Sequence, residues 1–122
     1  DALHAIATDP VSLAAARCGS LYPDHVVFLG PGIVETDTTE TATDAARRAG
    51  RPDAPIVIVP GAGVLLHGAA TPSALALARC LADVTCRLAG NDPVDPLSAT
   101  DEAQLLDWDA EKYRQSLDQR VP

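Results

Sequence analysis

The segment Pro55-Ile-Val-Ile-Val-Pro-Gly-Ala-Gly-Val-Leu-Leu-His67 contains two apolar runs with a very short connection between them. Residues 56–59 are all β-branched, which favours a strand, and the second run starts at Val64, directly after Gly61-Ala62-Gly63. A parallel pair of strands needs a crossover of about a dozen residues or more. We therefore predict an antiparallel hairpin over about residues 55–68.

Patterns typical of helices lie on both sides of this hairpin. Thr71-Pro72 supplies an N-cap threonine and a proline at the first helical position, and an apolar stripe then continues to Leu88. Asp9-Pro10 gives the same signal for a helix that Gly19 ends, and residues 38–49 have helix-compatible spacing before a glycine. We expect the helix after Thr71 to cover the sheet.

A final helix is predicted near the C-terminus. Its N-cap is Thr100 or Ser98, the latter in a capping-box pattern with Asp101. The apolar positions of this helix recur on one face and are Leu106, Ala110, Tyr113 and Leu117.

The run His25-Val-Val-Phe-Leu29 is β-branched and aromatic, and it is bounded by Tyr22-Pro23-Asp24 and Gly30-Pro31-Gly32. We interpret this run as a buried strand, and residues 32–35 are compatible with a further short strand.

The order of elements predicts one α/β domain over residues 1–122, with a layered sheet covered by helices. Because the chain begins at Asp1 and lacks methionine, we interpret it as a segment of a longer protein.

Charge and composition exclude several classes of partner. The 122 residues carry a net charge of −8, and no basic stripe exists that would neutralise the phosphates of a nucleic acid. No apolar run approaches the roughly 20 residues of a membrane span, so we expect no membrane association. Three cysteines without paired spacing fit a reducing compartment, and we expect a cytoplasmic protein.

Two glycine-rich turns follow the predicted strands. Gly30-Pro31-Gly32 contains a proline, and Gly61-Ala62-Gly63 leads into a strand, so neither matches a dinucleotide-binding fingerprint. One interpretation is that the glycines only satisfy turn geometry. The alternative is a binding module for a small sugar or sugar phosphate, in which backbone N–H groups meet an anion. The candidate ligand-binding residues are Gly30, Gly32, Gly61, Gly63 and His67.

Asp24 and His25 are the candidate catalytic residues, because a histidine titrates near neutrality and an adjacent carboxylate can hold its charged form. On this hypothesis the chain is an independent enzyme. The alternative is that Asp24 only caps the turn. The three histidines, His4, His25 and His67, lack metal-ligand spacing, and we predict no metal site in this segment.

The residues 56–68 and the helix containing Ala74 resemble the end of the class II aldolase/adducin domain. There a strand runs into Asn-His-Gly, a second strand ends at a glycine, and a helix follows with an alanine six positions on. Gly63, Gly68 and Ala74 fall on these family positions. Residues 22–29 and the ending Trp108-x-x-Glu-Lys112 are similar to longer class II aldolase-like proteins, including the bifunctional rhamnulose-1-phosphate aldolase/dehydrogenase type.

The resemblance implies that the histidine of Asn-His-Gly, one of three zinc ligands in the catalytic family, is replaced here by Ala62. An alanine cannot hold a metal, and no His-x-His occurs in the chain. We therefore expect a non-catalytic structural or assembly domain at the C-terminus of an aldolase-like sugar-phosphate lyase. Zinc is expected only in an upstream catalytic domain, which would also be the partner. Since the family usually forms tetramers, a second copy of the chain is another implied partner.

Overall fold

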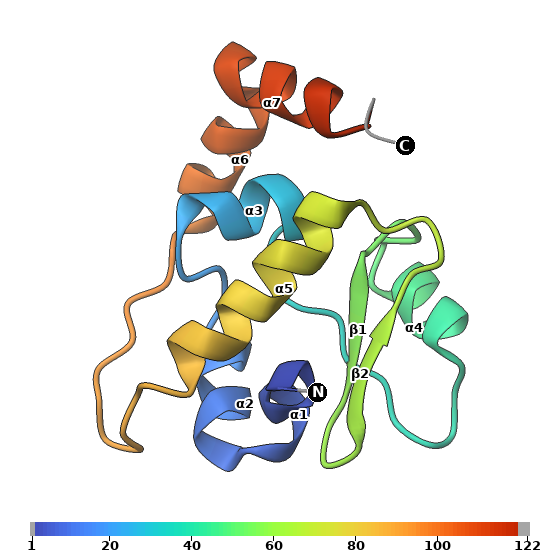
Figure 1. Cartoon of the computed structure of the whole chain (residues 1–122), viewed down its shortest axis with the longest axis vertical. Helices are drawn as coiled ribbons and strands as arrows, with labels where there is room; N and C mark the ends of the chain where they lie inside the picture. Colours follow the sequence, from blue (N-terminus) through green and yellow to red (C-terminus); the bar gives the residue numbers. More distant parts are fainter. Residues whose placement is uncertain (1, 120–122) are drawn as a thin grey trace.

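The computed structural model describes residues 2–119 (Figure 1). In this part the chain is a mixed α/β protein with one two-stranded sheet. The elements in chain order are η1 (Ala2–His4), α1 (Ala5–Thr8), α2 (Pro10–Arg17), α3 (Pro23–Leu29), α4 (Ala42–Arg48), β1 (Ile56–Val59), β2 (Gly63–Leu66), α5 (Pro72–Thr85), α6 (Ala99–Asp107) and α7 (Asp109–Gln119).

The predicted hairpin is confirmed. Strands β1 and β2 pair antiparallel, with Ile56 opposite Leu66 and Val59 opposite Gly63. The other edge of β1 meets residues 34–36, where the Ile58 N–H donates to the Val34 carbonyl at 2.8 Å and the Thr36 N–H donates to the Ile58 carbonyl at 2.9 Å. The short strand expected at residues 32–35 is thus a single parallel bridge between Glu35 and Ile58.

The N-caps predicted from the sequence are present at the starts of α2, α5 and α6. Asp9 accepts a hydrogen bond from the Ser12 N–H, Thr71 accepts one from the Ala74 N–H, and Ser98 forms a capping box with Asp101. The helix predicted from residue 38 starts only at Ala42, because Thr41 is its cap. The helix predicted to reach Leu88 ends at Thr85.

The prediction of a strand at residues 25–29 is wrong, because these residues belong to helix α3. Pro23 occupies its first turn, and Gly30 ends it with φ 81°. A run of this length does not distinguish a buried strand from a buried helix by its pattern alone. The described sheet also offers no place beside β1, since residues 34–36 already bond to that edge.

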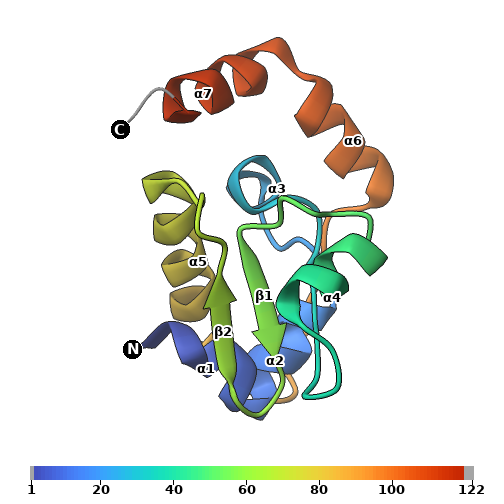
Figure 2. The same ribbon diagram turned by 90° about the vertical axis from the view of Figure 1, so that its right-hand side faces the viewer.

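The main core lies on the face of the sheet that α1 and α5 cover, and α4 packs on the other face (Figure 2). Ile58, Val64 and the α5 residues Ala78 and Leu81 belong to the main core. Val57, one residue along the same strand, belongs to a second cluster with residues of α4. This alternation is the one expected for a strand with both faces covered.

The single C-terminal helix of the prediction is two helices, because Trp108 takes an extended conformation between α6 and α7. Its predicted apolar face is not buried. Tyr113 is 62% exposed, Leu117 is 42% exposed and Trp108 is 59% exposed. Helix α7 instead turns polar side chains toward α3: Arg114 pairs with Asp24 at 3.0 Å and its guanidinium lies 5.2 Å from the centre of the Phe28 ring. None of the helices in residues 2–119 is long and apolar enough to span a bilayer.

Candidate ligand-binding pocket

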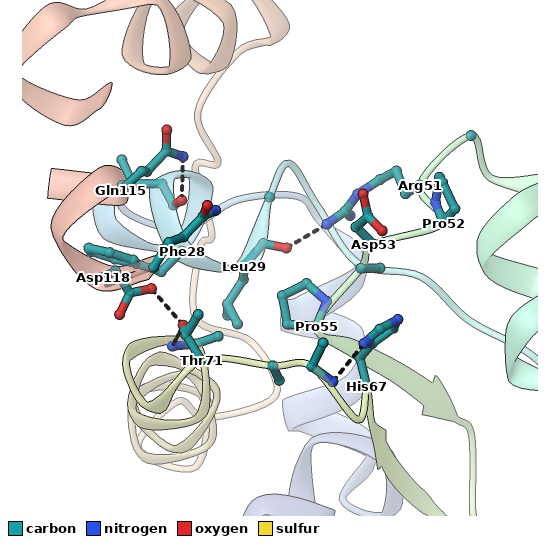
Figure 3. Close-up of a pocket in the computed structure, with 18 residues that line it drawn as sticks. Phe28, Leu29, Arg51, Pro52, Asp53, Pro55, His67, Thr71, Gln115 and Asp118 are labelled. Atoms are coloured by element: carbon teal, nitrogen blue, oxygen red, sulfur yellow. Dashed lines mark hydrogen bonds between the residues drawn. The ribbon is translucent and has the colours of Figure 1, made fainter. Parts of the chain in front are cut away.

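A cavity of about 590 Å³ lies where four segments of the chain meet (Figure 3). Its walls are the end of α3 with Gly30, the loop of residues 50–55, the connection from His67 into the first turn of α5, and the last turns of α7. This volume falls in the range of small-molecule sites. The pocket is therefore the candidate functional site of the described chain.

Arg51 forms one side of the pocket and holds the end of α3. Its Nη2 donates to the Leu29 carbonyl and its Nη1 donates to the Pro31 carbonyl at 2.6 Å. Burial lowers the pKa of Arg51, and the more distant Glu102 carboxylate opposes that shift. In residues 2–119 no carboxylate lies within ion-pair distance of this guanidinium. Two carbonyl bonds leave three of the five guanidinium N–H groups unused.

Helix α7 forms the roof of the pocket through two hydrogen bonds. The Thr71 hydroxyl donates to Asp118 Oδ2 at 2.6 Å, and Gln115 Nε2 donates to the Val27 carbonyl at 2.8 Å. Thr71 also accepts from the Ala74 N–H, so one hydroxyl joins the start of α5 to the roof. The second oxygen of Asp118 and the side-chain carbonyl of Gln115 keep free acceptor capacity.

The pocket includes two of the residues predicted as ligand-binding, Gly30 and His67. His67 is exposed, and its Nδ1 accepts from the Ala69 N–H at 3.0 Å. The guanidinium of Arg51 approaches the backbone at position 30 so closely that a glycine is required there, because a Cβ would lie 2.2 Å from Arg51 Nη2. Gly32, Gly61 and Gly63 do not line the pocket.

The Gly61-Ala62-Gly63 turn lies at the opposite end of the hairpin from the pocket, so the structure does not bring the two glycine turns together. Gly63 has a packing role there. A Cβ on Gly63 would lie 2.7 Å from His4 Nδ1, and that same nitrogen accepts from the Val64 N–H at 3.0 Å. Ala62 is exposed at the tip of the turn.

Asp24 and His25 are neighbours on α3, but their side chains serve different partners. Asp24 pairs with Arg114, whereas the fully buried His25 donates from Nε2 to the Gly32 carbonyl at 2.7 Å. Burial lowers the pKa of His25. Its Nδ1 has no hydrogen-bond partner in the described chain, and its ring packs edge-on against Tyr22. The structure therefore does not assemble these two residues into one site.

Sequence reasoning missed the residues that shape the pocket. Among these residues only Thr71 carried a prediction, as a helix cap, and no role was predicted for Arg51, Asp118 or Gln115. Thr71 and Asp118 lie 47 positions apart, and Gln115 and Val27 lie 88 positions apart. No local pattern signals contacts of that range.

Within residues 2–119 there is no group of three or more His, Cys, Asp or Glu side chains placed to hold a metal ion. No protein-family model matches the sequence, and no curated protein or solved structure shows significant similarity to the chain. The relationship to the class II aldolase/adducin family therefore stays a prediction.

Proposed function

We propose that this chain is a non-catalytic domain that binds a small polyhydroxylated molecule, a sugar or sugar phosphate, in the pocket between α3, α5 and α7. The observation that carries the proposal is a 590 Å³ cavity whose polar groups come from separate segments and keep unused hydrogen-bonding capacity. Sugar hydroxyls both donate and accept. Asp118 and Gln115 supply acceptors, Arg51 supplies donors, and Phe28 adds an apolar wall.

The proposed role is binding rather than catalysis because the pocket residues are not arranged as a nucleophile with its base. His67 lines the pocket, and its Nδ1 already accepts a hydrogen bond from the backbone N–H of Ala69. The Thr71 hydroxyl donates a hydrogen bond to Asp118 of α7, and it also caps the N-terminus of α5 by accepting from the Ala74 N–H. The side chains of His67 and Thr71 thus stabilise the fold, and the cavity beside them can still hold a ligand.

Calorimetry tests the binding proposal directly. We expect saturable heat with one binding site when fructose 1-phosphate or fructose is titrated at up to millimolar concentration. Ala69 is exposed and lines the pocket, so Ala69→Trp should fill the cavity and abolish the heat. The matched control is Ala62→Trp at the distant hairpin tip, which should leave binding unchanged. Absence of heat for both sugars, or equal binding by both variants, contradicts the proposal.

A second proposed role is assembly, as the C-terminal domain of a class II aldolase-like protein whose zinc chemistry lies upstream. Ala62 at the position of the family's histidine supports this role, and so do the exposed apolar side chains of Trp108, Tyr113 and Leu117. Exposed apolar groups in one region mark interaction surfaces. Light scattering of the chain, alone and with Tyr113→Ser and Leu117→Ser together, tests it. A monomer in both cases, and no association with an upstream domain, would refute an assembly role.

A further inference from the structure

Arg51 differs from the other arginines whose ion pairs the structure defines. Arg17 pairs with Glu35 at 2.7 Å, Arg48 pairs with Glu40 at 2.7 Å, and Arg114 pairs with Asp24 and Glu111. These three are exposed, where a charge is solvated by water. Arg51 is half-buried, lines a cavity, and has only neutral carbonyls as hydrogen-bond partners among the described residues.

A half-buried guanidinium with no carboxylate within ion-pair distance is suited to binding an anion. Its charge has been partly removed from water, so the gain from an opposite charge is larger than at an exposed position. Its planar donors match the oxygens of phosphates and carboxylates and form short, charge-assisted hydrogen bonds with them. The bonds to Leu29 and Pro31 fix the guanidinium in place, so little side-chain freedom is lost on binding.

The pocket is polarised along its length. Arg51 lies on one side, and Asp118, bonded to Thr71, lies on the other (Figure 3). An acidic group would be repelled at the Asp118 side, whereas hydroxyl groups would donate to the carboxylate there. The two ends therefore favour different groups of one molecule.

We propose that the ligand carries an acidic group, a phosphate or a carboxylate, which pairs with Arg51, and hydroxyl groups that face Asp118. This inference rests on the proposed binding function and names its ligand class. Asp53 also lines the pocket, two positions from Arg51, but its side chain is exposed and therefore screened by solvent. Its carboxylate opposes the acidic group, so Asp53→Asn should tighten binding of that group.

The experiment compares acidic and neutral sugars on the unaltered protein by calorimetry, so it does not depend on a variant that folds. The pairs are fructose 1-phosphate against fructose, and gluconate against glucose. We expect the acidic member of at least one pair to bind at least about tenfold more tightly, as for a well-formed charged hydrogen bond. The pair that shows this preference identifies phosphate or carboxylate as the group recognised.

Two variants locate the preference. Arg51→Gln should bring the dissociation constants of the acidic and neutral sugars together, and Arg51→Lys should keep part of the difference because it keeps the charge. Arg47→Gln, on the exposed surface of α4, is the matched control and should change nothing. Equal affinity for acidic and neutral sugars in the unaltered protein overturns this inference and leaves sugar binding standing. No saturable binding of any of the four compounds overturns the binding function itself, and the inference with it.

Discussion

Replacing Gly30 with alanine should be among the most damaging single-methyl additions in this chain. Gly30 has φ 81° and ψ 169°, a conformation that is essentially restricted to glycine and costs another residue about 1–3 kcal/mol. The added Cβ would also lie 2.2 Å from Arg51 Nη2. The guanidinium can swing away, but it then loses its bonds to the Leu29 and Pro31 carbonyls, which together contribute roughly 2–3 kcal/mol.

The expected loss in the free energy of unfolding is therefore about 3–6 kcal/mol, a large fraction of the roughly 5–15 kcal/mol that stabilises a typical domain. Gly61→Ala is the matched control. Gly61 has φ 79°, but a Cβ there meets nothing within 4 Å, so only the backbone cost of about 1–2 kcal/mol remains. Urea unfolding followed by far-ultraviolet circular dichroism measures both variants.

A double-mutant cycle with Arg51→Gln separates the two contributions to the Gly30→Ala effect. If the clash with the guanidinium is real, the cost of Gly30→Ala should fall by about 2 kcal/mol once the arginine is absent. The backbone cost should remain. A coupling energy below about 0.5 kcal/mol would show that Arg51 does not pack on Gly30 in solution and that its guanidinium is not fixed beside the pocket.

Three further changes test other contacts. Because burial lowers the pKa of His25 below 6.5, unfolding takes up a proton in acid, so stability should be full above pH 6.5 and fall as the pH drops below it. The slope, which for one proton is at most about 1.4 kcal/mol per pH unit, should be reduced in His25→Asn, as urea midpoints at several pH values would show. Gly63→Ala should cost about 1–3 kcal/mol by displacing His4; an unchanged urea midpoint would contradict that contact. Thr71→Ala should cost about 1–2 kcal/mol and expose the amides of the last turns of α7 to hydrogen exchange, since it removes both a helix cap and the Asp118 bond.

The parts of the fold that the sequence predicted correctly are those set by local chemistry. The three residues of the Gly61–Gly63 link forced an antiparallel hairpin, and the caps at Asp9, Thr71 and Ser98 each act within three positions of themselves. Such signals need no knowledge of the rest of the chain. They set where helices start, and they say little about which face a helix buries.

The errors arose where tertiary contacts decide between local alternatives. Residues 25–29 have the β-branched composition of a strand, yet the bond between Arg51 and Leu29 and the packing on α5 stabilise a helix. At the C-terminus, the extended Trp108 interrupts the helix, and the contacts of Arg114 with Asp24 and Phe28 orient α7 by its polar face. Neither outcome follows from apolar spacing.

No local pattern in the sequence indicated the candidate pocket, for the same reason. Gly30 and His67 were among the residues predicted to bind a ligand, and both line the pocket. They were chosen because backbone N–H groups in the loops at the ends of the predicted strands could meet an anion. Gly61 and Gly63, chosen by the same rule, lie at the other end of the hairpin, where His4 Nδ1 accepts a hydrogen bond from the Val64 N–H. The rule therefore named residues at both ends of the hairpin without indicating which end lines a pocket.

The walls of the pocket differ in how firmly they are held, and this bears on affinity. The α3 and α5 walls join the buried core through Leu29 and Ala74, which also line the pocket. The roof depends on polar contacts, among them the half-exposed ion pair of Arg114 with Asp24, and an exposed pair contributes only about 0–1 kcal/mol. A ligand that bonds to Asp118 must therefore also hold α7 in place. Part of its binding free energy orders the roof, so affinity should depend more on the rigid Arg51 side than on the Asp118 side.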